Sequence, residues 1–119
     1  MAKSMLIISR QPPWAGPAAR EALDIALAGG AYDLPVAMLF LDDGVYQLMD
    51  AQAPAHVQQK NLAANLQALP LFGIDDVFVC ASSLQQRGLA DHPLALAAKI
   101  LTREELQRLL PRFDLLVTL

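Results

Sequence analysis

The sequence is poor in the side chains that disulfides and most metal sites need. Its 119 residues include one cysteine and two histidines. One cysteine excludes a disulfide within the chain, and His56 and His92 do not show metal-ligand spacing. We therefore expect no bound metal and interpret both histidines as surface residues. A pair formed by Cys80 and His92 is the alternative, because both residues are expected near the same edge of a sheet.

Signals for nucleic acids, nucleotides and membranes are also missing. The nine lysines and arginines are scattered and the formal net charge is −3, whereas a nucleic-acid surface needs clustered basic residues. Neither a Gly-x-Gly-x-x-Gly fingerprint nor a Walker loop is present, so we expect no cofactor. No apolar run reaches the length of a membrane span, and the first residues show no signal-peptide spacing. These absences predict a cytoplasmic protein that contacts neither a membrane nor nucleic acid directly.

Apolar residues, in contrast, are abundant. They make up 55% of the chain, and charged residues make up 18%, against about 45–50% and about 25% in ordinary domains. A chain of this length forms a single domain, residues 1–119, with much surface for its volume. Surplus apolar side chains on such a surface usually mark a protein–protein interface. We therefore interpret the chain as a subunit of an assembly. The alternative is a monomer whose apolar fraction is raised by alanine.

Apolar runs alternate with helical patterns along the chain. Strands are expected at residues 4–9, 35–41, 76–80, 97–101 and 113–119. Helices are expected at residues 18–28 and 54–69, in a short segment that follows Cys80 and ends at Gly88, and from residue 102 to Pro111. Strands that alternate with helices predict an α/β fold with a parallel sheet and helices on both of its faces.

Local signals predict where several elements begin and end. Gly29 and Gly30 are expected to stop the first long helix. Residues 42–44, Asp-Asp-Gly, are interpreted as a turn. An acid or metal pair formed by the two aspartates is the alternative, but adjacent side chains point in different directions. Thr102 and Glu105 have the spacing of a capping box, which predicts the start of the last helix.

Cys80 stands where an expected strand leads into an expected helix. Ligands bind at this carboxyl edge of parallel sheets, and the first turn of a helix offers free N–H groups and a partial positive charge. From its position alone, we interpret Cys80 as a small buried apolar residue, which is what free cysteines usually are. The alternative is that the backbone amides of Ala81, Ser82 and Ser83 stabilise a thiolate or persulfide at Cys80, which would act as a nucleophile. Trp14, in a proline-rich loop near the same edge, is either an interface anchor or a core residue.

Several segments together carry a family pattern. They are residues 13–16, 19–24, 42–48, 69–74, 79–84 and 87–89. In order and spacing they resemble the DsrE/DsrF/DsrH sulfur-relay family, and the resemblance covers essentially the whole chain. It implies a three-layer α/β/α domain with a five-stranded parallel sheet.

The resemblance also implies partners and a function. The chain would join TusB-like and TusD-like subunits in a heterohexamer with two copies of each. That complex would take persulfide sulfur from a TusA-like donor and pass it to a TusE-like acceptor, towards thiolation of the tRNA wobble uridine. The family's established persulfide cysteine belongs to the TusD-like sister, so a structural, accessory role is implied here. The alternatives are a sulfurtransferase intermediate with Cys80 as the sulfur carrier, and a flavodoxin-like module that binds a small ligand.

Overall fold

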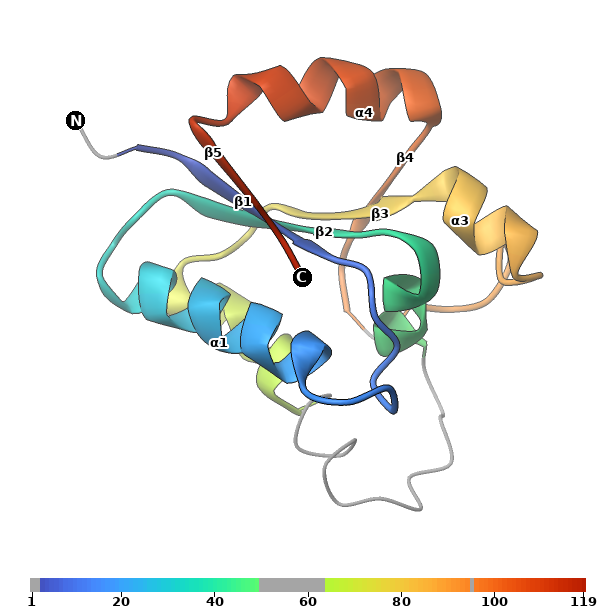
Figure 1. Cartoon of the computed structure of the whole chain (residues 1–119), viewed down its shortest axis with the longest axis horizontal. Coiled ribbons are helices and arrows are strands. Elements are labelled where there is room, and N and C mark those ends of the chain that lie inside the picture. The colour runs from blue at the N-terminus through green and yellow to red at the C-terminus, as the bar shows by residue number, and fades with distance from the viewer. Residues whose placement is uncertain (1–2, 50–63, 95) are drawn as a thin grey trace.

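A five-stranded parallel sheet forms the centre of the computed structural model, which describes residues 3–49, 64–94 and 96–119. The strands are β1 (Met5–Ser9), β2 (Val36–Phe40), β3 (Val77–Cys80), β4 (Lys99–Leu101) and β5 (Leu115–Thr118). Their order across the sheet is β4-β3-β2-β1-β5 (Figure 1). Each strand lies within its expected range, and the predicted parallel sheet is confirmed.

Helices cover both faces of the sheet and make a three-layer α/β/α fold. α1 (Ala18–Ala31) lies on one face and α4 (Arg103–Leu109) lies on the other (Figure 1). α3 (Ala81–Gln86) follows β3 directly. The short 3-10 helices are η1 (Asp42–Leu48), η2 (Leu69–Phe72) and η3 (Leu110–Arg112). Of the helix expected at residues 54–69, residues 64–67 are helical, and the part before residue 64 lies outside the described residues. Within the described ranges, no helix is long and apolar enough to cross a membrane.

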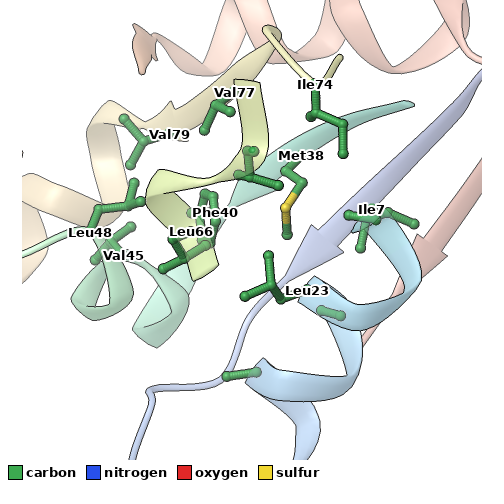
Figure 2. Close-up of a cluster of buried hydrophobic side chains, with 14 of the residues drawn as sticks. Ile7, Leu23, Met38, Phe40, Val45, Leu48, Leu66, Ile74, Val77 and Val79 are labelled. Carbon is green, nitrogen blue, oxygen red and sulfur yellow. The ribbon is translucent and has the colours of Figure 1, made fainter. Parts of the chain in front are cut away.

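The two faces of the sheet carry separate hydrophobic cores. On the α1 side, Leu23 packs with strand residues that include Met38 and Phe40 (Figure 2). On the α4 side, Leu106 packs in a cluster that includes Leu39. β2 is buried along its whole length because its alternate residues enter both cores. This two-sided burial explains the continuous apolar run of the strand.

The expected end of the first helix was wrong. α1 continues through Gly29 and Gly30 to Ala31, and the chain turns afterwards at Asp33, whose φ is 60°. A Cβ on Gly29 would lie 2.8 Å from Cγ2 of Val36, and one on Gly30 would lie 2.5 Å from the carbonyl oxygen of Phe72. The two glycines therefore allow α1 to approach β2 and η2 closely, and they do not act as a helix stop.

The segment after β2 also differs from the expectation. Residues 42–44 begin the 3-10 helix η1, where an isolated turn was expected. Asp42 adopts the left-handed region with φ 51°, which costs free energy for a residue with a Cβ. A Cβ on Gly44 would collide with the carbonyl oxygen of Ser9, so only glycine fits there. The close approach of Gly44 brings η1 against the end of β1, at the carboxyl edge of the sheet.

Candidate functional site

Cys80 lies at the predicted junction between a strand and a helix. It is the last residue of β3 and the N-cap of α3. Its Sγ accepts a hydrogen bond from the backbone N–H of Ser83 at 3.5 Å. The junction follows from the sequence, because an apolar run that fits between two helical layers ends where the Ala-Ser-Ser-Leu segment can start a helical turn.

The thiol is also packed into the core on the α4 side of the sheet. Cys80 is 7% exposed and belongs to the cluster that includes Phe78 and Leu106. Its register partner in the neighbouring strand is Leu101. The two alternative interpretations of Cys80 therefore both have a basis in the structure. The sulfur contacts an amide of the helix start, and the residue is buried among apolar side chains.

Ser83 is the predicted amide that contacts the sulfur. Ala81 and Ser82 stand in the same first turn and are half-buried, whereas Ser83 is 5% exposed. The Oγ of Ser83 accepts a hydrogen bond from the backbone N–H of Asp42 at 2.9 Å. Through this serine, the start of η1 is connected to the turn that holds Cys80. The sequence did not predict this connection, because its partners are 41 residues apart.

The adjacent aspartates of η1 pair with different arginines. Asp42 Oδ2 lies 2.8 Å from Nε of Arg10, and Asp43 Oδ1 lies 2.8 Å from Nε of Arg87. Arg87 also donates from Nη1 to the carbonyl oxygen of Ser83 at 3.1 Å. The aspartates therefore do not share a site, which agrees with the expectation that their side chains point apart. Exposed pairs of this kind contribute little stability individually, but they connect η1 to the loop after β1 and to the end of α3.

A buried hydrogen bond connects the end of β1 to η1 at the same edge of the sheet. Ser9 and Gln47 are 1% and 4% exposed, and Gln47 Nε2 donates to Ser9 Oγ at 2.8 Å and to the carbonyl oxygen of Gln11 at 2.9 Å. Oε1 of Gln47 is buried and has no hydrogen-bond partner among the described residues. The sequence did not predict the contact between these two residues. Nothing in the local pattern distinguishes a glutamine that enters the core from one that faces solvent.

Trp14 lies at the surface, so the interpretation as a core residue was wrong. The side chain is 57% exposed. Its ring packs against Tyr46 of η1, with ring centroids 5.2 Å apart and planes inclined by 52°. The tilted contact holds the loop after β1 against η1. The interface role of Trp14 stays a prediction.

The histidines and acidic residues form no evident metal centre in the part of the chain that the structure describes. Nδ1 of His92 lies 2.9 Å from the carbonyl oxygen of the neighbouring Pro93, and His92 is exposed. His56 lies outside the described residues. No group of three or more His, Cys, Asp or Glu side chains in the described ranges could hold a metal ion.

Two hollows lie at opposite ends of the sheet. A groove of about 750 Å³ lies between α4 and the amino ends of the strands, and charged residues that include Asp76, Lys99 and Arg108 line it. A smaller hollow of about 350 Å³ lies at the carboxyl edge and is lined by Arg10, Gln11, Asp42, Asp43, Thr118 and Leu119. Cys80 lines neither of them. In both hollows, the charged lining residues are therefore separate from the cysteine.

Comparisons with known proteins agree on one family. The model of the DsrE/DsrF-like family matches residues 3–119. A protein of Pseudomonas aeruginosa named Protein TusC homolog is 65% identical over 119 residues, and the match covers 100% of both chains. A protein of Vibrio parahaemolyticus with the same name is 40% identical over 98 residues, which are 82% of this chain and 83% of the relative. Among solved structures, the crystal structure of the ychN protein from E. coli matches over 100% of both chains with a TM-score of 0.82 and 21% identity, which supports the fold.

Proposed function

The chain belongs to the DsrE/DsrF-like family, and from this premise we propose that it is an accessory subunit of a cytoplasmic sulfur-relay complex. The observation that carries the proposal is the full-length match at 65% identity with the Pseudomonas aeruginosa protein named as a TusC homolog. In the proposed complex, the chain joins TusB-like and TusD-like subunits in a heterohexamer. The complex receives persulfide sulfur from a TusA-like donor and delivers it to a TusE-like acceptor, towards thiolation of the tRNA wobble uridine.

The accessory role is supported by the surroundings of Cys80. The residue is 7% exposed and packed against Phe78 and Leu106, so an external donor has little access to its sulfur. The chain has no second cysteine, so a sulfur atom on Cys80 would have to leave to another protein. Exposed apolar side chains such as Tyr32 and Leu71, which are 81% and 87% exposed, are available for contacts with neighbouring subunits.

The second candidate function is a sulfurtransferase intermediate at Cys80. The observation that favours it is the hydrogen bond from the Ser83 N–H to Sγ, because an amide at this position stabilises a sulfur anion. In this mechanism the Cys80 thiolate attacks the outer sulfur of the donor persulfide. The new S–S bond forms at Cys80, the S–S bond of the donor breaks, and the donor leaves as a thiolate. Sulfur moves from one chain to the other with no net oxidation or reduction.

Persulfide trapping in the reconstituted complex separates the two roles. The complex is loaded with sulfur by a cysteine desulfurase and the TusA-like donor, alkylated, and each subunit is weighed by mass spectrometry. We expect a gain of one sulfur atom on the TusD-like chain and none on this chain. A gain on this chain that disappears in the Cys80→Ser variant would instead assign the carrier role to Cys80.

Two further readouts test the accessory role itself. Native mass spectrometry of the chain co-expressed with TusB-like and TusD-like subunits should detect a complex that contains all three. The Cys80→Ser variant should enter that complex and support sulfur delivery to the TusE-like acceptor at the normal rate. A chain that stays a soluble monomer in the presence of both partners would contradict the proposal.

A further inference from the structure

β5 forms one edge of the sheet, and among the described residues β1 is the strand that pairs with it. The N–H of Leu115 binds the carbonyl oxygen of Ser4, and the N–H of Leu119 binds that of Ile8. Because alternate residues of a strand point their main-chain groups in opposite directions, Leu116 and Thr118 direct theirs away from β1. β5 is drawn at the front of Figure 1, at the end of the strand order. The edge can therefore accept another strand.

The two edges of the sheet differ in how they are protected. β4, at the far edge, has three residues and includes the exposed Lys99. Short length and lysine both discourage pairing with another strand. β5 has the sequence Leu-Leu-Val-Thr without a charge, and its Leu115 and Leu116 are 50% and 48% exposed. These two leucines lie on opposite faces of the sheet, so β5 is apolar on both sides where natural edges usually are not.

We propose that β5 pairs antiparallel with β5 of a second copy of this chain, with the twofold axis at Leu116. The outward main-chain groups of Leu116 then bond to those of its own equivalent. On that face, Thr118 lies opposite Asp114 of the second copy, so a hydroxyl faces a carboxylate. On the other face, Leu115 lies opposite Val117. Each apolar side chain meets an apolar one, and no like charges stand opposite each other within the strand.

This self-complementarity is the reason to assign a second copy as the occupant. A twofold contact requires that one surface fits itself, and strand addition supplies both main-chain hydrogen bonds and alternate side-chain contacts. Cross-strand pairs of branched aliphatic residues stabilise such a contact. The pairing joins the five-stranded sheets of the two copies through their uncharged edges. It goes beyond the proposed sulfur relay, since it depends only on the edge strand.

Disulfide trapping tests the register directly. Residues opposite each other in a hydrogen-bonded antiparallel pair have Cα atoms about 5.5 Å apart, which is within the range of about 4.4–6.8 Å that a disulfide spans. The variant Leu116→Cys is made in a Cys80→Ser background and oxidised with diamide. Its matched control is Ile100→Cys in the same background, because Ile100 is 50% exposed on the opposite edge strand. On denaturing, non-reducing gels we expect a disulfide-linked dimer from Leu116→Cys and no cross-link from Ile100→Cys.

A second pair of variants tests the association without a covalent bond. Leu116→Lys places two ammonium groups at the twofold axis and should turn the dimer into a monomer in sedimentation velocity. Ile100→Lys should leave the dimer intact, and circular dichroism checks that both variants are folded. The proposal is overturned if the unmodified chain is a monomer, if Leu116→Lys associates as the unmodified chain does, or if Leu116→Cys cross-links to a sister subunit in the complex. The persulfide readout is independent of all these outcomes.

Discussion

Ser83 connects three parts of the carboxyl edge through its own atoms. Its N–H donates to Sγ of Cys80, its Oγ accepts from the N–H of Asp42, and its carbonyl oxygen accepts from Arg87. The residue is almost fully buried, so these contacts are not exchanged with water. A buried polar group that loses its partner costs more free energy than the net value of the hydrogen bond. The hydroxyl of Ser83 therefore connects η1 to the turn that holds Cys80, and its main-chain atoms contact Cys80 and Arg87.

Replacement of Ser83 by alanine tests this connection. We expect Ser83→Ala to lower the free energy of unfolding by about 1–3 kcal/mol, because it leaves the N–H of Asp42 without its acceptor. Ser82→Ala is the matched control, since Ser82 is the adjacent serine in the same helical turn and is half-buried. Denaturant titration of both variants gives the comparison. Equal losses for the two serines would show that the hydroxyl of Ser83 does not hold η1 against α3.

Single residues also show where sequence analysis succeeds. The position of Cys80 could be predicted because an apolar run and a helical segment meet at that residue. The contact between Ser9 and Gln47 could not be predicted, because it joins residues 38 positions apart and depends on how η1 folds back. The exposure of Trp14 stayed open for a similar reason. Its partner Tyr46 belongs to η1, whose placement requires the close approach of Gly44 to Ser9.

Among the helices, the sequence predicted the start of α4 correctly but not the end of α1. The predicted capping box of α4 is confirmed. The Thr102 N–H donates to Oε1 of Glu105 at 2.9 Å, and the Glu105 N–H donates to Oγ1 of Thr102 at 3.3 Å. This signal depends on residues three positions apart, so the sequence alone contains it. The predicted end of α1 was wrong because Gly29 and Gly30 allow close packing against β2 and η2. Rules that use only neighbouring residues do not include such tertiary contacts.

The capping box should make α4 sensitive to acid. The hydrogen bond from the Thr102 backbone N–H holds the pKa of Glu105 below its ordinary value. A hydrogen bond with the Thr102 side chain lowers this pKa further, to a smaller extent. A carboxyl group with a lowered pKa in the folded state stabilises the fold above its unfolded pKa, and this contribution is lost as the pH falls through the folded pKa. We expect Glu105→Gln to reduce the acid-induced loss of stability. Denaturation measured from neutral to acid pH provides the test.

Two further variants complete that experiment. Glu104→Gln is the control, because Glu104 occupies the same first turn, whereas the capping box is formed by Thr102 and Glu105. It should retain the pH dependence of the unmodified chain. Thr102→Ala removes the side-chain cap and should lower the free energy of unfolding by about 1 kcal/mol at neutral pH. An identical pH dependence for Glu105→Gln and the unmodified chain would contradict the role assigned to the carboxylate.

At the scale of the whole molecule, the layered architecture was predictable, and the isolated chain exposes many apolar side chains on its surface. Alternating strands and helices predicted the three layers, because each crossover between parallel strands needs a helix on one face. The strand order could not be predicted in this way, since β1, near the start of the sequence, pairs with β5, near its end. The apolar surplus of the composition appears as exposed side chains on several elements. They are Trp14, Ile25, Tyr32, Leu34, Leu71, Phe72, Ile100, Leu115 and Leu116.

Trp14 offers a test of which part of this surface the sister subunits cover. It is the chain's single tryptophan, and its contact with Tyr46 holds the ring in place while 57% of it stays exposed. Tryptophan in such a setting is typical of interface anchors. We expect that assembly with TusB-like and TusD-like subunits buries the ring. With 5-fluorotryptophan incorporated into this chain alone, the ¹⁹F resonance should shift on assembly and lose its sensitivity to H₂O/D₂O exchange.

The variant Trp14→Ala distinguishes an anchor from a bystander. Removal of an interface anchor costs about 2 kcal/mol or more of binding free energy, so the dissociation constant of the complex should rise at least about 30-fold. The free energy of unfolding of the chain alone should change little, because more than half of the side chain is in water. Tyr46→Phe is the control, since it keeps the ring that supports Trp14. A complex that forms with an unchanged ¹⁹F resonance and an unchanged dissociation constant for Trp14→Ala would place the interface on a different face of the molecule.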